Sequence, residues 1–188
     1  MQTVDHLPTP DAAPSSTRRL IVRVVLGLVM AGFAAFWIWA LFFASKEAVN
    51  RIEDRAWAAR GQQICLQAGE DRLELTDLRS IVDADADLIR ERAEIVDRAT
   101  DILERMVDEL VAVEPNDAKG QGIVPLWEAD YRTYLQDRRN YAEQLRLTGE
   151  NQPFYETELG SIPISERIST FAGDNEMPAC APPYDLSR

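Results

Sequence analysis

The stretch DADADLIRERAE, residues 83–94, has the residue types and the spacing of a calcium-binding loop. Its acidic residues stand at positions 1, 3, 5, 9 and 12, where an EF-hand loop carries oxygen ligands: Asp83, Asp85, Asp87, Glu91 and Glu94. Such a loop needs glycine at its sixth position for a sharp turn, and this sequence has Leu88 there. Leu88 and Ile89 also belong to an apolar helical pattern that a loop would interrupt. We therefore predict the solvated acidic face of a helix, on which Arg90 can pair with Asp87 and Glu94.

Other arrangements of residues suited to catalysis are scarce. The single histidine, His6, lies in a polar amino-terminal stretch, so the remainder of the chain has no His-based triad and no histidine metal ligand. No phosphate-binding glycine loop occurs. Carboxylates are abundant, but no pair of them stands out in an apolar setting. We expect a protein that is not an enzyme and holds no metal or cofactor, with a hydrolase based on a carboxylate pair as the alternative.

One amphipathic pattern could bind a ligand or a protein partner. Its members recur at helical spacing and would share one face of a helix: Trp127, Tyr131, Tyr134, Arg138 and Tyr141. Arg138 could anchor an anion on this candidate interaction face. Aromatic faces of this kind more often belong to the core, with tyrosine hydroxyls at its edge, so both interpretations stay open.

Residues 24–44, VVLGLVMAGFAAFWIWALFFA, contain no charged side chain in 21 positions. As a helix this run would be about 31 Å long, close to the hydrocarbon thickness of a bilayer. We predict one transmembrane helix over residues 20–45 that acts as an uncleaved anchor. A cleaved signal peptide is the alternative, but its apolar region would be shorter and a small-x-small site should follow. Gly27, Ala31 and Ala35 repeat every four positions, a spacing that permits close association of membrane helices.

The two cysteines, Cys65 and Cys180, lie far apart in the part of the chain that follows this span. They suit a disulfide and hence an oxidising compartment, and two buried free thiols are the alternative. Basic residues flank the span about equally, but long carboxyl-side domains translocate largely regardless of charge. We predict residues 1–19 as a disordered cytoplasmic tail and residues 45–188 outside the membrane. That outer part has 17 Lys and Arg against 30 Asp and Glu, which argues against nucleic acid as a partner.

Apolar residues recur at seven-residue spacing from Ala68 to Leu110. This register predicts one long amphipathic helix over residues 46–113, with Gly69 as the point where it could bend. Pro115 would end this helix, because the residue before a proline avoids the helical region.

The rest of the outer part reads as a shorter helix and a tail. Pro125 suits the first turn of a helix over residues 125–148, which Gly149 would end. With only a short connection, this aromatic-faced helix should pack antiparallel on the long one. For residues 149–188 we predict a short helix, from Pro163 to residue 172, and an irregular tail.

Two segments carry a resemblance to a known group of proteins. WEADYRTYLQDRRNYA (residues 127–142) and FAGDNEMPACAPPYDL (residues 171–186), with Cys65 after a single span, resemble uncharacterised single-pass envelope proteins of Actinobacteria. The resemblance extends over most of residues 20–188. It implies a bacterial plasma membrane, an extracytoplasmic helical domain and pairing of Cys65 with Cys180, and it carries no assigned activity.

Together these patterns predict an all-α fold. One transmembrane helix would precede an elongated extracytoplasmic helical bundle or coiled-coil-like hairpin with a disulfide-tethered carboxyl-terminal tail. We expect a non-enzymatic scaffold or protein-interaction component of the cell envelope. It would contact the lipid bilayer through residues 20–45 and bind a protein partner or a second copy of itself. The alternative is an extracytoplasmic sensory or ligand-binding domain that signals through a membrane partner.

Overall fold

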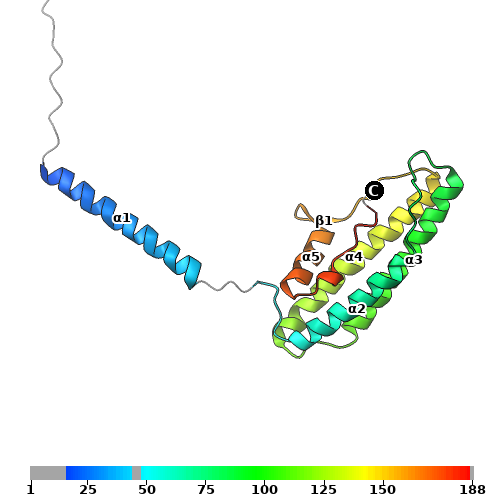
Figure 1. Cartoon of the computed structure of the whole chain (residues 1–188), viewed down its shortest axis with the longest axis horizontal. Coiled ribbons are helices and arrows are strands. Elements are labelled where there is room, and N and C mark those ends of the chain that lie inside the picture. Colours follow the sequence, from blue (N-terminus) through cyan, green and yellow to red (C-terminus); the bar gives the residue numbers. More distant parts are fainter. Residues whose placement is uncertain (1–15, 44–47, 187–188) are drawn as a thin grey trace, which may run out of the picture. The chain divides into compact units, whose positions relative to one another are not determined.

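A computed structural model describes residues 16–43 and 48–186 of the 188-residue chain. Its helices and strands, in chain order, are α1 (Ser16–Phe42), α2 (Arg55–Leu73), α3 (Ala86–Val111), α4 (Ala118–Thr148), β1 (Glu158–Leu159), β2 (Ile162–Pro163), α5 (Ile164–Asp174) and the short 3-10 helix η1 (Pro178–Cys180) (Figure 1). The chain divides into two compact units, residues 1–47 and residues 48–188. The described part is mostly helical, as the sequence predicts.

Helix α1 is long and apolar enough to cross a membrane. Its 27 residues extend over about 40 Å, more than the roughly 30 Å hydrocarbon core of a bilayer. Large apolar side chains are exposed along it, and no stripe of them is buried within the chain. Of the predicted disordered tail, residues 1–19, the first 15 lie outside the described residues. Residues 16–19 belong to α1, so the prediction of disorder is wrong for them.

The single long helix predicted over residues 46–113 is wrong, because α2 and α3 are separate helices. Gly69, the expected point of bending, lies inside α2, and the break begins after Leu73. Residues 48–54, near the start of the predicted helix, are not helical either. Residues 46 and 47 lie outside the described residues.

Side chains that bind the backbone explain the break at residues 74–85. Asp77 Oδ1 accepts a hydrogen bond from the backbone N–H of Arg79 at 3.0 Å. Ser80 Oγ accepts another from the backbone N–H of Val82 at 3.2 Å. Short polar side chains that bind the backbone in this way favour turns over helix. The apolar spacing continues through the segment, but the backbone there is irregular.

Helices α3 and α4 lie side by side (Figure 1), and their ion pairs show that they run antiparallel. Arg132 of α4 pairs with Asp108 of α3 at 2.6 Å. Farther along α4, Arg146 pairs with Asp97, which lies earlier in α3. Residue numbers therefore rise along one helix as they fall along the other.

Helix α4 begins at Ala118 rather than at the predicted Pro125. Asp117 defines this start, because its carboxylate accepts a hydrogen bond from the backbone N–H of Gly120 at 2.7 Å. Pro125 therefore lies inside the helix, where it cannot donate a backbone hydrogen bond. The end of α4 is as predicted, since Gly149 adopts the left-handed conformation, with φ 64°, directly after it.

After α4 the chain returns to α2 through the β1–β2 hairpin, α5 and η1. Asn175, which follows α5, binds the segment before α2. Its Oδ1 accepts a hydrogen bond from the backbone N–H of Ile52 at 2.9 Å, and its Nδ2 donates to the carbonyl of Asn50 at 2.9 Å. The predicted disulfide between Cys65 and Cys180 is present and joins α2 to η1.

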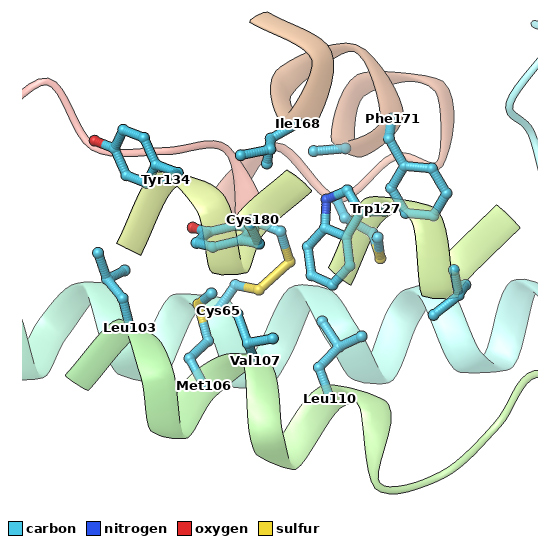
Figure 2. Packing of buried hydrophobic residues seen from close by; sticks show 14 of the residues in the cluster. Cys65, Leu103, Met106, Val107, Leu110, Trp127, Tyr134, Ile168, Phe171 and Cys180 are labelled. Carbon is cyan, nitrogen blue, oxygen red and sulfur yellow. A yellow bond between two sulfur atoms is a disulfide. The ribbon is translucent and has the colours of Figure 1, made fainter. Parts of the chain in front are cut away.

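One large hydrophobic cluster fills the space among α2, α3, α4, α5 and η1. Figure 2 shows the disulfide inside this cluster, among side chains that include Val107 of α3. Trp127 of α4 packs on Phe171 of α5, with 5.5 Å between ring centroids. A smaller cluster, which includes Ile89 and Leu145, joins α3 to α4. The core therefore depends on contacts between segments that are distant in the sequence.

Candidate ligand-binding site

The acidic stretch at residues 83–94 spans the end of a loop and the start of α3. Asp83 lies in the loop with a left-handed φ of 58°, so the prediction that places it on a helix is wrong. Asp85 is the N-cap of α3, where its carboxylate accepts a backbone hydrogen bond at 2.9 Å. Of the two partners predicted for Arg90, Asp87 is the one with which it pairs, at 2.6 Å. Within residues 16–43 and 48–186, no group of three or more His, Cys, Asp or Glu residues could hold a metal ion.

The aromatic face predicted for α4 belongs to the core. Its members are between 0% and 7% exposed: Trp127, Tyr131, Tyr134, Arg138 and Tyr141. As a surface for a protein partner this prediction is wrong, because the neighbouring helices and the carboxyl-terminal segment cover the face. The two central tyrosines differ at their hydroxyls. That of Tyr134 donates to the carbonyl of Pro183 at 3.1 Å, whereas that of Tyr131 has no hydrogen-bond partner in the described part of the chain.

Arg138 is fully buried and holds the carboxyl-terminal segment. Its guanidinium donates two parallel hydrogen bonds to the Asp185 carboxylate, Nη1 to Oδ1 at 2.6 Å and Nη2 to Oδ2 at 3.0 Å. Its Nε donates to Thr100 Oγ1 at 3.0 Å. Burial by itself lowers the pKa of Arg138, but the hydrogen bonds to Asp185 and its charge outweigh burial and raise that pKa. Paired hydrogen bonds between a guanidinium and a carboxylate are among the strongest in proteins.

A cavity of about 650 Å³ adjoins this ion pair. Its walls come from the end of α2, residues 74–85, α3, α4 and the carboxyl-terminal segment. Apolar side chains form much of the lining, among them Ile95, Val96 and Tyr141. The volume lies within the range of small-molecule sites, which combine apolar walls with a few polar groups.

The charged side chains that line the cavity are unbalanced. There are four arginines and two carboxylates: Arg72, Arg79, Arg92, Arg138, Asp77 and Asp185. This local excess of positive charge contrasts with the acidic composition of the chain, which has a net charge of −12. Arg72 and Arg92 each have a buried Nε with no hydrogen-bond partner among the described residues. A buried donor without a partner costs about 1–3 kcal/mol.

Asp77 organises the irregular segment at the mouth of the cavity. Arg79 donates to Asp77 Oδ2 at 2.8 Å and to Glu91 Oε2 at 2.7 Å. Arg92 donates to the carbonyl of Arg79 at 2.9 Å. Chiefly through its side-chain hydrogen bonds, Arg79 lowers the pKa of Asp77 to about 2. These contacts attach residues 74–85 to α3 and so shape one wall of the cavity.

The small-residue face of α1 carries no observed contact. A Cβ added at Gly27 would meet nothing within 4 Å, and Ala31 and Ala35 are likewise exposed. Association of membrane helices through this face therefore stays a prediction.

Sequence reasoning missed most of the cavity. Arg72, Arg92 and Asp185 come from three distant parts of the chain, and no local motif connects them. The one signal was Arg138 within the aromatic pattern, which suggested an anchor for an anion. That arginine does hold a carboxylate, although the carboxylate comes from the chain itself.

The fold and the site define a class of protein: a helical domain with a cationic cavity, preceded by one helix able to cross a membrane. Comparison of the chain with protein-family models, with curated proteins and with solved structures gave no match. Any function must therefore be argued from the geometry of the site.

Proposed function

We propose that this chain is a membrane-anchored binding domain whose cavity takes a small amphipathic anion, and that it is not an enzyme. The observation that supports this is the cavity itself, with its excess of guanidinium groups and its apolar walls. A bound anion would interact with the guanidinium groups that line the cavity, among them those of Arg72 and Arg92, and its apolar body would contact Ile95 and Val96. No histidine or cysteine is among the described residues that line the cavity, so the common nucleophile–base pairs do not occur there.

The proposal includes a location. Helix α1 would span a bacterial plasma membrane, with the amino terminus in the cytoplasm and the domain outside. The disulfide supports an oxidising compartment. Leu147→Cys tests the orientation, because Leu147 is 70% exposed. A membrane-impermeant thiol reagent should label this variant in intact cells, and labelling only after lysis would contradict the location.

Ligand binding can be tested with a matched pair of probes, sodium hexanoate and its neutral analogue hexanamide. The full chain in detergent micelles is heated, and near-ultraviolet circular dichroism follows the loss of tertiary structure. Hexanoate should raise the Tm and hexanamide should not, because only hexanoate carries the charge that the arginines would bind.

Two variants decide whether an effect of hexanoate arises in the cavity. Arg72→Gln removes a guanidinium that lines it and should abolish the increase in Tm. Arg98→Gln, at an exposed position of α3, removes the same charge elsewhere and should leave the increase intact. Equal responses of both variants, or equal effects of both probes, would contradict binding of an anion at this site.

A protein-interaction component of the cell envelope is the second candidate. It is supported by exposed apolar side chains that line the mouth of the cavity: Leu73, Leu78 and Val82 are 72%, 87% and 70% exposed. Exposed apolar groups gathered at one place are typical of interaction sites. A photo-crosslinking residue at position 78 should then capture one recurrent protein or a second copy of this chain, and absence of adducts would favour the small ligand.

A further inference from the structure

The carboxyl-terminal segment forms one wall of the cavity that would hold the ligand, and its Asp185 covers Arg138. Asp185 presents its carboxylate to the buried Arg138, and Oδ2 of that carboxylate also lies 3.5 Å from Arg72 Nη1. The next residue, Leu186, packs against the smaller hydrophobic cluster between α3 and α4. A carboxylate therefore covers the buried guanidinium, and a branched apolar group beside it lines the same cavity.

We propose that residues 181–186, the arm, are an internal occupant of the carboxylate position on Arg138, and that the ligand which displaces them is a carboxylate with an apolar body. This inference rests on the proposed function, because it requires that the cavity bind a ligand. It adds two properties: the chemical class of the ligand, which Asp185 and Leu186 together imitate, and a competition that weakens binding until the arm leaves.

The arm is attached in a way that permits release. The disulfide fixes the chain at Cys180, and the residues that follow η1 form no helix or strand as far as residue 186. The arm can therefore leave without breaking the disulfide or unfolding a helix. The Asp185 side chain is 35% exposed, whereas that of Arg138 is 0% exposed, so solvent and ligand approach the ion pair from the side of the arm.

The buried charge of Arg138 explains the preference for a carboxylate. A buried guanidinium that loses its partner is strongly destabilising. If a ligand carboxylate replaces that of Asp185, the two parallel hydrogen bonds are exchanged for an equivalent pair, and the charge does not stay unpaired. A neutral ligand of the same shape offers no such replacement, so the arm would keep its place against it.

Asp185→Asn tests the competition directly. The variant keeps the size of the side chain but removes the charge that holds the arm on Arg138. An arm that is seated about 90% of the time reduces the apparent affinity about tenfold, so its release should tighten binding by that factor. Titration calorimetry measures the Kd of hexanoate for the full chain in detergent micelles, with hexanamide as the neutral control.

Two further variants separate release of the arm from general destabilisation. Leu186→Ser weakens the apolar contact of the arm and leaves the Arg138–Asp185 pair in place, so it should also tighten hexanoate binding. This variant keeps the proposal testable if Asp185→Asn fails to fold. Asp117→Ala removes the N-cap of α4, destabilises the domain away from the cavity, and should leave the Kd unchanged.

The outcomes distinguish this inference from the proposed function on which it rests. Tighter binding in the two arm variants alone supports the arm as an internal occupant. The same Kd in the wild-type protein, both arm variants and Asp117→Ala would overturn it, although the cavity would still be a ligand site. No binding of hexanoate to any of the four would overturn both.

Discussion

Replacement of both cysteines by alanine should remove a large part of the stability of the domain. The bond joins Cys65 and Cys180 across 115 positions, and the chain-entropy model assigns a loop of that length about 5 kcal/mol. Both residues are at most 1% exposed, so the loss of two buried sulfur atoms adds about 1 kcal/mol for the small cavities left behind. A total of about 6 kcal/mol is comparable to the whole stability of many domains.

The predicted change in Tm follows from the size of the domain. For a domain near 140 residues, 1 kcal/mol corresponds to roughly 3 °C, so the double variant should melt about 15–20 °C below the wild-type protein. Near-ultraviolet circular dichroism of the full chain in detergent micelles measures this, because buried aromatic side chains such as Trp127 report on the core. Wild-type protein in excess reductant should melt close to the double variant.

A difference in Tm below about 5 °C would refute this reasoning. It would mean that contacts without the bond, such as those of Asn175, hold the carboxyl-terminal part of the chain in place. Gln63→Ala serves as the matched control, because Gln63 is an exposed position on the same helix and its replacement should change the Tm by no more than about 2 °C.

Four further variants change single side chains. Tyr131→Phe should leave the free energy of unfolding in urea unchanged or raise it by up to about 1 kcal/mol, because it removes a buried hydroxyl with no hydrogen-bond partner in the described chain. Tyr134→Phe loses a hydrogen bond to the arm and should lower the free energy of unfolding by about 1 kcal/mol. A larger loss for Tyr131→Phe than for Tyr134→Phe would contradict these two expectations. Asp77 has a pKa lowered from 3.8 to about 2, chiefly by hydrogen bonds from Arg79, so its carboxylate stabilises the folded state above pH 4 and loses this effect as the pH falls towards 2. The destabilisation caused by Asp77→Asn, about 1–2 kcal/mol at pH 6, should disappear near pH 2, and a constant difference across this range would count against the ion pairs. Asp117→Ala should lower the free energy of unfolding by about 1–2 kcal/mol because it uncaps α4, and a variant as stable as the wild-type protein would show that the cap is dispensable.

Features that depend on short stretches of sequence could be predicted. The charge-free run made the long apolar helix evident, and Gly149 ended α4 where a left-handed glycine was expected. The helical spacing of aromatic residues identified a face of α4 that is in fact buried. The pattern indicated burial, but it could not show whether a protein partner or the chain itself covers that face.

The break between α2 and α3 escaped prediction because apolar spacing does not depend on whether the backbone stays helical. Val82 keeps the seven-residue register but is 70% exposed in the irregular segment, whereas Ile81 beside it is buried. The competing signal was the series of short polar residues from Asp77 to Asp85, which bind backbone groups rather than continue a helix. The cavity could not be predicted at all, since its arginines and Asp185 meet only after the whole domain has folded.

Asn175 limits the order in which the domain can assemble. A ribosome delivers Asn50 and Ile52 early and Asn175 about 120 residues later. Helices α2 and α3 can pair soon after synthesis, but the backbone N–H of Ile52 and the α2 side of the core acquire their native partners only when α5 and η1 have emerged. Closure over so long a stretch is slow, and the nascent chain meanwhile exposes the apolar surface on which chaperones act.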